Sequence, residues 1–469
     1  MKAFRRPNIL VIYTDQQRWD TLGCNGQRAV PTPNMDALAR MGARLDECYV
    51  QNPVCAPSRA SFLSGQYCSA LRIGTNGVRF PEDVPTLPGI LKAYGYTTAQ
   101  IGKLHFEPHS RRDHRDPPLR YGFDIMIQSD EPGCYDDAYT KWVERVAPEQ
   151  LDGVRTMLPP AAVMWGKKGY SDVPRNTHEP YCFAADASLT HTAFVTAQTC
   201  DFIRRQDKNT PYFCVAGYYA PHPPLNPPRE YIERVDRSKL RLPVVGEEET
   251  VSSALRDMTD EKWRDAACAY LAMVAQVDDG VGELLECIRQ RGDMEDTVIV
   301  FTSDHGEFLG DHGRIQKGMP GHDCITHVPC LVAYPRMISA GRVCGALTEA
   351  VDIAPTLLDY CGIQTPSFMQ GQSLAALLEG RTDVHKEAVL TEYFGEHGDR
   401  QTTVRTEKYK YYCPEQGAEL LFDLKKDPNE LRSVAGEPAY AAVMSEMRLH
   451  MLRAVQRAAY QGLPRIDEY

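Results

Sequence analysis

The sequence has no long apolar run: no segment reaches the roughly 20 residues that a membrane-spanning helix needs. It has no block of lysine and arginine either. The 52 basic and 63 acidic residues give a net charge of −11, which argues against a nucleic-acid-binding protein. Internal repeats and low-complexity tracts are also missing. With 43% hydrophobic residues in a chain of 469, these absences indicate a globular protein with a large core that binds neither membranes nor nucleic acids.

Paired cysteine motifs are lacking as well. The 15 cysteines are scattered along the chain, with no CxxC pair and no zinc-like spacing. Residues 1–7 are basic and lead directly into an apolar run, without the apolar stretch or cleavage site of a signal peptide. We therefore expect free thiols and a cytoplasmic location.

Short apolar runs alternate with helical patterns over most of the chain. This alternation predicts an α/β fold with a large, doubly wound, mostly parallel sheet and helices on both faces. The strand-like runs are 8–13, 97–101, 212–217, 297–302 and 330–333, and the helical patterns are 34–41, 87–93, 187–205, 262–291 and 352–360.

The pattern changes after about residue 362. Four short strand-like runs and a final helical pattern predict a small antiparallel sheet with one packed helix. We therefore divide the chain into a catalytic α/β domain, 1–365, and a small C-terminal α+β subdomain, 366–469. The runs are 389–393, 401–405, 409–412 and 420–424, and the helix is 439–460.

The most informative stretch is CAPSRASFLSG at 55–65, in which a cysteine stands two residues before a proline and four before an arginine. Pro57 fits the first turn of a helix, and Gly65 fits its C-cap. Cys55 would then lie at the positive end of the helix, where developing negative charge is favoured. Arg59, one turn further on, could stabilise that charge. The alternative is a buried structural cysteine before a short helix.

Polar side chains follow two of the predicted strands. Asp15 and Gln16 follow the first strand, and Asp304 and His305 follow the strand at 297–302. The carboxyl ends of strands in an open α/β sheet are where ligands bind, so these residues predict a site for a divalent cation. Oxygen ligands favour Ca²⁺ or Mg²⁺, and the imidazole admits Mn²⁺. The alternative is that both acids are loop residues or helix N-caps.

Taken together, these motifs resemble the sulfatase family, the formylglycine-dependent members of the alkaline-phosphatase-like superfamily. The resemblance covers nearly the whole chain. Its further segments are Gly-Lys-Leu-His at 102–105, Pro-His-Pro-Pro at 221–224, Asp-His-Gly-Glu at 304–307, Lys317 and the stretch 421–430.

The resemblance implies a modified nucleophile. Cys55 would be oxidised to formylglycine by a formylglycine-generating or anaerobic sulfatase-maturing enzyme. One hydroxyl of the hydrated aldehyde attacks sulfur, and the other later loses its proton and expels sulfate.

The resemblance also implies roles for the charged residues. Lys103 and Lys317 contact the sulfate oxygens, His105 orients or deprotonates the hydrated aldehyde, and His222 protonates the leaving oxygen. These roles agree with the chemistry, because a transition state with dispersed negative charge needs fixed cations and an alkoxide needs an acid active near neutral pH. The implied ligands of the cation, Ca²⁺ before Mn²⁺ or Mg²⁺, are Asp15, Gln16, Cys55, Asp304 and His305.

Two positions depart from the commonest family pattern. Many members have two consecutive acids after the first strand, where this chain has Gln16 as the second residue, and His305 replaces a frequent Asn. The combination is similar to the branch that contains phosphonate monoester hydrolases and phosphodiesterases. Substrate choice is expected to lie in loops 73–80, 109–120 and 158–178.

The main prediction is therefore a sulfuric ester hydrolase that acts on a small organic or carbohydrate sulfate. The second is a phosphonate monoester or phosphodiester hydrolase with promiscuous sulfatase activity. The third is a non-catalytic anion-binding protein in which Cys55 stays a thiol. The sequence specifies neither the ester nor the oligomeric state.

Overall fold

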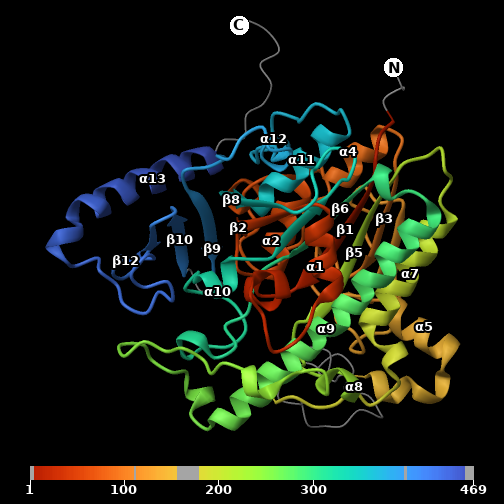
Figure 1. Cartoon of the computed structure of the whole chain (residues 1–469), viewed down its shortest axis with the longest axis horizontal. Coiled ribbons are helices and arrows are strands. Elements are labelled where there is room, and N and C mark those ends of the chain that lie inside the picture. The colour runs from red at the N-terminus through yellow and green to blue at the C-terminus, as the bar shows by residue number, and fades with distance from the viewer. Residues whose placement is uncertain (1–4, 110–111, 156–178, 396–398, 460–469) are drawn as a thin grey trace, which may run out of the picture.

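A computed structural model describes residues 5–109, 112–155, 179–395 and 399–459 (Figure 1). Its centre is an eight-stranded sheet with the strand order β4-β3-β5-β1-β6-β7-β2-β8. Neighbouring strands are parallel except that β7 runs antiparallel to both β6 and β2. The predicted α/β fold with a mostly parallel sheet is confirmed. The strands are β1 Asn8–Asp15, β2 Ala43–Tyr49, β3 Thr97–Gly102, β4 Ile125–Gln128, β5 Tyr212–Pro221, β6 Thr297–Ser303, β7 Cys330–Ala333 and β8 Arg342–Glu349.

Helices cover both faces of this sheet, because the central strands are buried on both sides. Along β1, Leu10 and Ile12 pack on one face, against α1, α7 and α9, whereas Ile9 and Val11 pack on the other, against α2, α4 and α11. This burial explains why the strand is apolar without interruption. The helices are α1 Pro33–Met41, α2 Cys55–Ser64, α3 Cys68–Leu71, α4 Leu87–Ala93, α5 Ala138–Val146, α7 His191–Arg205, α8 Arg229–Ile232, α9 Asp260–Arg291, α10 Asp323–Thr326, α11 Ile353–Tyr360 and α12 Ala375–Leu378.

The C-terminal part forms the predicted small antiparallel sheet with the order β12-β11-β10-β9. The helix α13, Ala441–Ala459, packs on it through Met444, Met447 and Met451 (blue in Figure 1). The edge strand β9 joins the large domain, because Glu392 donates its backbone N–H to the Gln51 carbonyl at 2.8 Å. The boundary at residue 365 stays a prediction. The strands are β9 Val389–Phe394, β10 Arg400–Arg405, β11 Tyr409–Pro414 and β12 Leu420–Asp423.

Three strands of the large sheet escaped the sequence pattern, namely β2, β4 and β8. The strands β4 and β8 form the two edges of the sheet, and β2 lies next to one edge. All three are only partly buried, so polar residues such as Arg44 and Asp46 interrupt their apolar runs. A half-exposed strand carries a weaker hydrophobic signal than a central one.

Within the described ranges, no helix is both long enough and apolar enough to cross a membrane. None of the 15 cysteines, all of which lie within the described ranges, forms a disulfide.

Candidate active site

The site lies at the carboxyl ends of four neighbouring strands, β3, β5, β1 and β6. Each of these ends supplies one or two polar side chains: Lys103 follows β3, His222 follows β5, Asp15 ends β1, and Asp304 and His305 follow β6. Because parallel strands end at the same edge, residues far apart in the chain meet there.

The helix α2 brings Cys55 to this edge. The helix begins at Cys55 and ends at Gly65, whose φ of 68° is left-handed and whose N–H donates to the Ser61 carbonyl at 2.9 Å. The expected helix start and glycine C-cap are confirmed. Cys55 is 1% exposed, and its Sγ lies 3.7 Å from Asp15 Oδ1 and 3.2 Å from His305 Nε2.

Four of the five predicted ligands form one compact cluster, which we call the metal cluster: Asp15, Cys55, Asp304 and His305. Their ligand atoms all lie within 4.8 Å of one another, and all four residues are buried. His305 Nδ1 lies 2.8 Å from the Gly306 carbonyl and donates to it. This bond leaves the Nε2 lone pair facing the two carboxylates, which is the usual arrangement of a ligating histidine.

Gln16, the fifth predicted ligand, stands beside this cluster. Its backbone is left-handed, with φ 66°, and its N–H donates to Asp304 Oδ1 at 3.0 Å. The side-chain amide is held on both sides: Nε2 donates to the Glu307 carboxylate, and Oε1 accepts from Lys317 Nζ at 3.2 Å.

Arg59 clamps the two carboxylates of the cluster. Its Nε lies 2.7 Å from Asp304 Oδ2, and its Nη2 lies 3.2 Å from Asp15 Oδ2. The guanidinium is 1% exposed and also donates to the Lys103 carbonyl at 3.0 Å. Every charged group here is therefore paired, as deep burial requires.

Lys103 completes the charge balance around Asp15, with Nζ 2.7 Å from Asp15 Oδ2. Burial alone would raise the pKa of the Asp15 carboxyl, but Lys103 and the other cations outweigh burial and hold that pKa well below its ordinary value. Asp15 is therefore a carboxylate at neutral pH, as a metal ligand must be.

Lys317 lies at the centre of a second set of contacts. Its Nζ is 2.7 Å from Cys55 Sγ and 2.9 Å from His222 Nε2. The other ring nitrogen, His222 Nδ1, lies 2.6 Å from the Pro223 carbonyl and donates to it. Burial, reinforced by Lys317, lowers the pKa of His222 well below its ordinary value. The His222 imidazole is therefore neutral, and the Lys317 ammonium donates the hydrogen bond to His222 Nε2.

Burial, with Asp15 beside it, raises the pKa of the Cys55 thiol to about 11. An unmodified Cys55 is thus protonated at neutral pH and a poor nucleophile, since the thiolate is the reactive form. This behaviour differs from that of a typical catalytic cysteine.

His105 occupies a strained backbone position with φ 62°. Asp130 holds this turn, because its Oδ1 accepts the N–H groups of Leu104 and His105 at 2.8 and 2.9 Å. The His105 ring is buried 4.3 Å from the His109 ring, and its Nδ1 has no hydrogen-bond partner among the described residues.

Two supporting residues were not given a role by the sequence. Glu307 was noted only as part of the motif at 304–307, and Asp130 carried no signal, because it follows the weakly patterned strand β4. Of the loops expected to set substrate choice, 158–178 lies outside the described residues, as do residues 110 and 111 of the second loop.

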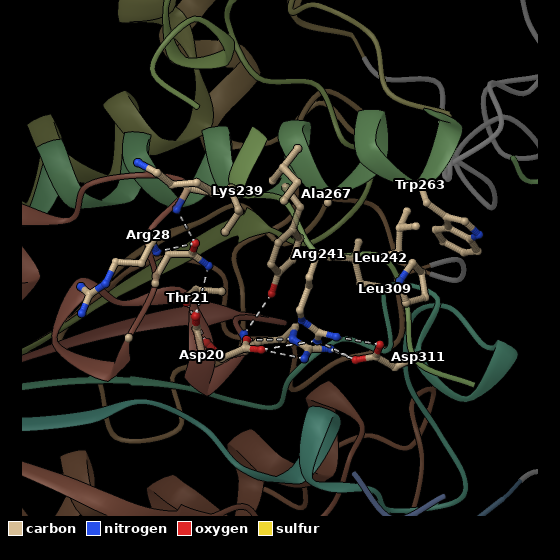
Figure 2. A pocket seen from close by; sticks show the side chains of 18 of the residues that line it. Asp20, Thr21, Arg28, Lys239, Arg241, Leu242, Trp263, Ala267, Leu309 and Asp311 are labelled. Carbon is tan, nitrogen blue, oxygen red and sulfur yellow. Dashed lines mark hydrogen bonds and ion pairs between the residues drawn. The ribbon is translucent and has the colours of Figure 1, made fainter. Parts of the chain in front are cut away.

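A separate cavity of about 300 Å³ lies beyond the loop that follows β1 (Figure 2). Arg18, Asp20, Arg241 and Asp311 form an ion network on its wall, with Arg18 Nη1 and Arg241 Nη2 at 2.9 and 2.7 Å from Asp311 Oδ2. The rest of the wall consists of Trp263, Tyr270, aliphatic side chains and polar residues such as Gln27 and Lys239. Because these charges satisfy one another, the network anchors the segment after Gln16 rather than offering a reactive group.

The chain matches two family models. Residues 7–363 match the family model described as Sulfatase, and residues 310–457 match the model described as N-sulphoglucosamine sulphohydrolase, C-terminal. An arylsulfatase of Clostridium perfringens is 28% identical, with 96% of this chain and 95% of that protein covered.

Two further similarities bear on the substrate. An N-acetylglucosamine-6-O-sulfatase of Bacteroides thetaiotaomicron is 29% identical, covering 97% of this chain and 87% of that protein. The crystal structure of a phosphonate monoester hydrolase of Agrobacterium radiobacter superposes with a TM-score of 0.82 at 27% identity, covering 97% and 96% of the two chains.

Proposed function

The chain belongs to the sulfatase family and is a sulfuric ester hydrolase, and on that premise we propose that it works with a formylglycine made from Cys55 and with one divalent cation. The observation that carries this proposal is the buried cluster of Asp15, Cys55, Asp304 and His305, with Lys317 directly on the Cys55 sulfur. The hydrated aldehyde would supply the attacking hydroxyl, and the cation would act as a Lewis acid toward it.

The residues around Cys55 fit such a modification. The thiol itself is protonated because burial raises its pKa to about 11, so the thiol has little reactivity of its own. The position at the first residue of α2 favours an oxyanion, as does the ammonium of Lys317 at 2.7 Å. A maturation enzyme would oxidise Cys55. Because none of the 15 cysteines forms a disulfide, we propose a reducing compartment, the cytoplasm, for the mature protein.

The donor set also fits a cation. Asp15 and Asp304 offer carboxylate oxygens, Gln16 an amide oxygen and His305 an imidazole nitrogen already oriented by the Gly306 carbonyl. Two carboxylates and an amide suit Ca²⁺, which we propose as the resident ion, and the imidazole also admits Mn²⁺.

The remaining cations of the site would bind the sulfate group. Lys103 and Lys317 flank Asp15 and Cys55, so their ammonium groups can face the sulfate oxygens on either side of the nucleophile. His222 and Lys317 share one proton across 2.9 Å. We propose that Lys317 passes this proton to His222 Nε2 during the reaction and that His222 then delivers it to the leaving oxygen.

The proposed substrate is a small carbohydrate sulfate. The similarity to an N-acetylglucosamine-6-O-sulfatase supports this class. So does the fold shared with a protein whose structure contains D-glucosamine-2-N,6-O-disulfate as its substrate, at a TM-score of 0.75.

Mass spectrometry tests the modification directly. The peptide that contains Cys55, from protein co-expressed with a formylglycine-generating enzyme, should carry the aldehyde, and specific activity should rise with the modified fraction. Fully active protein with only thiol at Cys55 would refute the mechanism.

A second candidate function is the hydrolysis of phosphonate monoesters or phosphodiesters. The observation that favours it is the pair Gln16 and His305: Gln16 gives the site one carboxylate fewer than a second acid at that position would, and His305 replaces the frequent Asn. The similarity to a phosphonate monoester hydrolase supports it too. Rates on matched sulfate, phosphonate monoester and phosphodiester substrates decide between the two functions; the main proposal expects the highest kcat/KM on sulfate.

A further inference from the structure

Two segments run side by side next to Lys103, at the edge of the site. One follows β3 and carries His109, and the other follows β4 and carries Glu131; Ser129 N–H joins them by donating to the Gly102 carbonyl at 3.0 Å. His109 Nε2 lies 3.9 Å from Glu131 Oε1. The side chains are 10% and 15% exposed, so both are largely buried.

The contacts of the Glu131 carboxylate with Lys103 and Tyr219 are each longer than a competing contact of the same partner. Its Oε1 lies 4.0 Å from Lys103 Nζ, whereas Asp15 holds the same ammonium at 2.7 Å. Tyr219 OH lies 3.1 Å from Glu131 Oε2 but 2.6 Å from the Pro223 carbonyl, and a hydroxyl has only one hydrogen to donate. The shorter contact takes that hydrogen, so the carboxylate keeps its accepting capacity.

The His109 ring can also form further hydrogen bonds. Neither of its ring nitrogens has a hydrogen-bond partner among the described residues, although both are buried: Nδ1 lies 4.0 Å from Asp130 Oδ2, and Nε2 lies 3.9 Å from Glu131 Oε1. Buried polar atoms in native proteins are normally paired, so two unpaired atoms on one side chain call for a partner.

The spacing between the two side chains identifies that partner. A gap of 3.9 Å is too long for a direct hydrogen bond but fits one hydroxyl oxygen about 2.8 Å from each atom. A hydroxyl can accept from the imidazole N–H and donate to the carboxylate at once. A second anion, by contrast, would be repelled by the Glu131 carboxylate.

The position of the gap assigns it to the alcohol half of the substrate. Glu131 is within 4.0 Å of Lys103 and, through Tyr219, adjacent to His222, whose ring lies 4.6 Å from the Tyr219 ring. We propose that His109 and Glu131 form a subsite for a hydroxyl group of the leaving alcohol, so that the enzyme selects polyhydroxylated, carbohydrate-type sulfates over aryl sulfates. The inference rests on the proposed function, since the alcohol is the one released from the ester.

The test compares two esters in three variants. N-acetylglucosamine 6-sulfate has hydroxyls on its alcohol half, and 4-nitrophenyl sulfate has none. Glu131→Gln and His109→Phe should each lower kcat/KM on the sugar sulfate by about 10- to 100-fold, the range for a hydrogen bond to a charged group, and change it by less than about threefold on the aryl sulfate. Glu286→Gln, an exposed carboxylate on α9 bonded to Arg289 and Gln290, should leave both rates unchanged.

Several results would overturn the proposal. One is an equal loss on both esters, and another is no loss on the sugar ester, as expected if only a water fills the gap. Metal content and thermal unfolding, measured in each variant, separate a specific effect from misfolding.

Failure of the proposed function has a different signature, because wild-type enzyme would then hydrolyse neither sulfate. The subsite is in that case judged by saturation-transfer NMR with free N-acetylglucosamine. Binding by wild type that is lost in Glu131→Gln supports the subsite, and no binding by wild type overturns it. Glucosamine, which carries a free amine, is measured as well. If Glu131→Gln loses binding of glucosamine but not of N-acetylglucosamine, the subsite binds a cation, and the hydroxyl assignment is overturned.

Discussion

The orientation of the Gln16 amide should control metal affinity, and Glu307 should control that orientation. Glu307 is 3% exposed. Its Oε1 accepts from the backbone N–H groups of Leu309, at 2.9 Å, and of Gln316, and its Oε2 accepts from Gln16 Nε2. A carboxylate can only accept, so the amide NH₂ must face Glu307, and the amide oxygen points the other way, where it accepts from Lys317 Nζ at 3.2 Å beside the metal cluster.

Glu307→Gln replaces one acceptor oxygen by an NH₂ donor and leaves the size of the side chain unchanged. The new amide oxygen must stay on the two backbone N–H groups, so its NH₂ faces that of Gln16. The Gln16 amide then turns over and presents N–H groups, which cannot bind a cation. The lost hydrogen bond to a charged group is worth about 1.5–3 kcal/mol, or about 10- to 100-fold in affinity, which is also the usual effect of removing a group that orients a metal ligand.

The assay is calorimetric titration of metal-stripped protein with Ca²⁺ and with Mn²⁺. Glu307→Gln should raise Kd for the bound ion by about 10- to 100-fold. The control is Glu392→Gln, because Glu392 is likewise 3% exposed and likewise accepts a backbone N–H, from Ser69 at 3.0 Å, but lies on β9. The double variant Glu307→Gln with Gln16→Glu should recover affinity, since a carboxylate at position 16 accepts from the new NH₂ and still offers an oxygen to the metal.

The reasoning would be refuted by an unchanged Kd in Glu307→Gln, or by an equal loss in Glu392→Gln. It would also fail if the double variant bound metal no better than Glu307→Gln alone, because orientation would then not be the cause.

Three further predictions concern the charged residues of the site. Asp15→Asn and Asp304→Asn should each remove the metal, as measured by elemental analysis, and nearly all turnover. Full metal occupancy in both variants would contradict the ligand assignment. Asparagine is preferred to alanine because Arg59 and Lys103 pack against these side chains. His222→Ala should slow hydrolysis of a sugar sulfate by about 10²–10⁴-fold but that of 4-nitrophenyl sulfate by only about tenfold, because a good leaving group needs little protonation; equal losses would make Lys317 the acid. Lys103→Ala should lower kcat/KM for both esters by similar factors, since it removes charge from the sulfate itself; a loss confined to the sugar ester would assign it to the alcohol instead.

The sequence alone predicted the fold class and most of the residues that meet at the candidate site. Short, β-branched apolar runs such as 8–13 favour strands buried on both faces, and polar residues directly after parallel strands lie at one edge of the sheet. The start of α2 at Cys55 and its end at Gly65 followed from the proline and glycine, because these residues restrict or extend the backbone locally. Local chemistry of this kind is readable from spacing.

Only the tertiary structure decided how these residues are paired. Arg59 was expected to stabilise charge on the nucleophile, which stays a prediction; the structure shows that its guanidinium pairs with Asp15 and Asp304, because two buried carboxylates need a cation. Two further distances depend on loops that come together from distant parts of the chain: the hydrogen bond between Lys317 and His222, and the 3.9 Å between His109 Nε2 and Glu131 Oε1. No spacing in the sequence encodes such distances, since they are set by how the strand ends and loops pack in three dimensions.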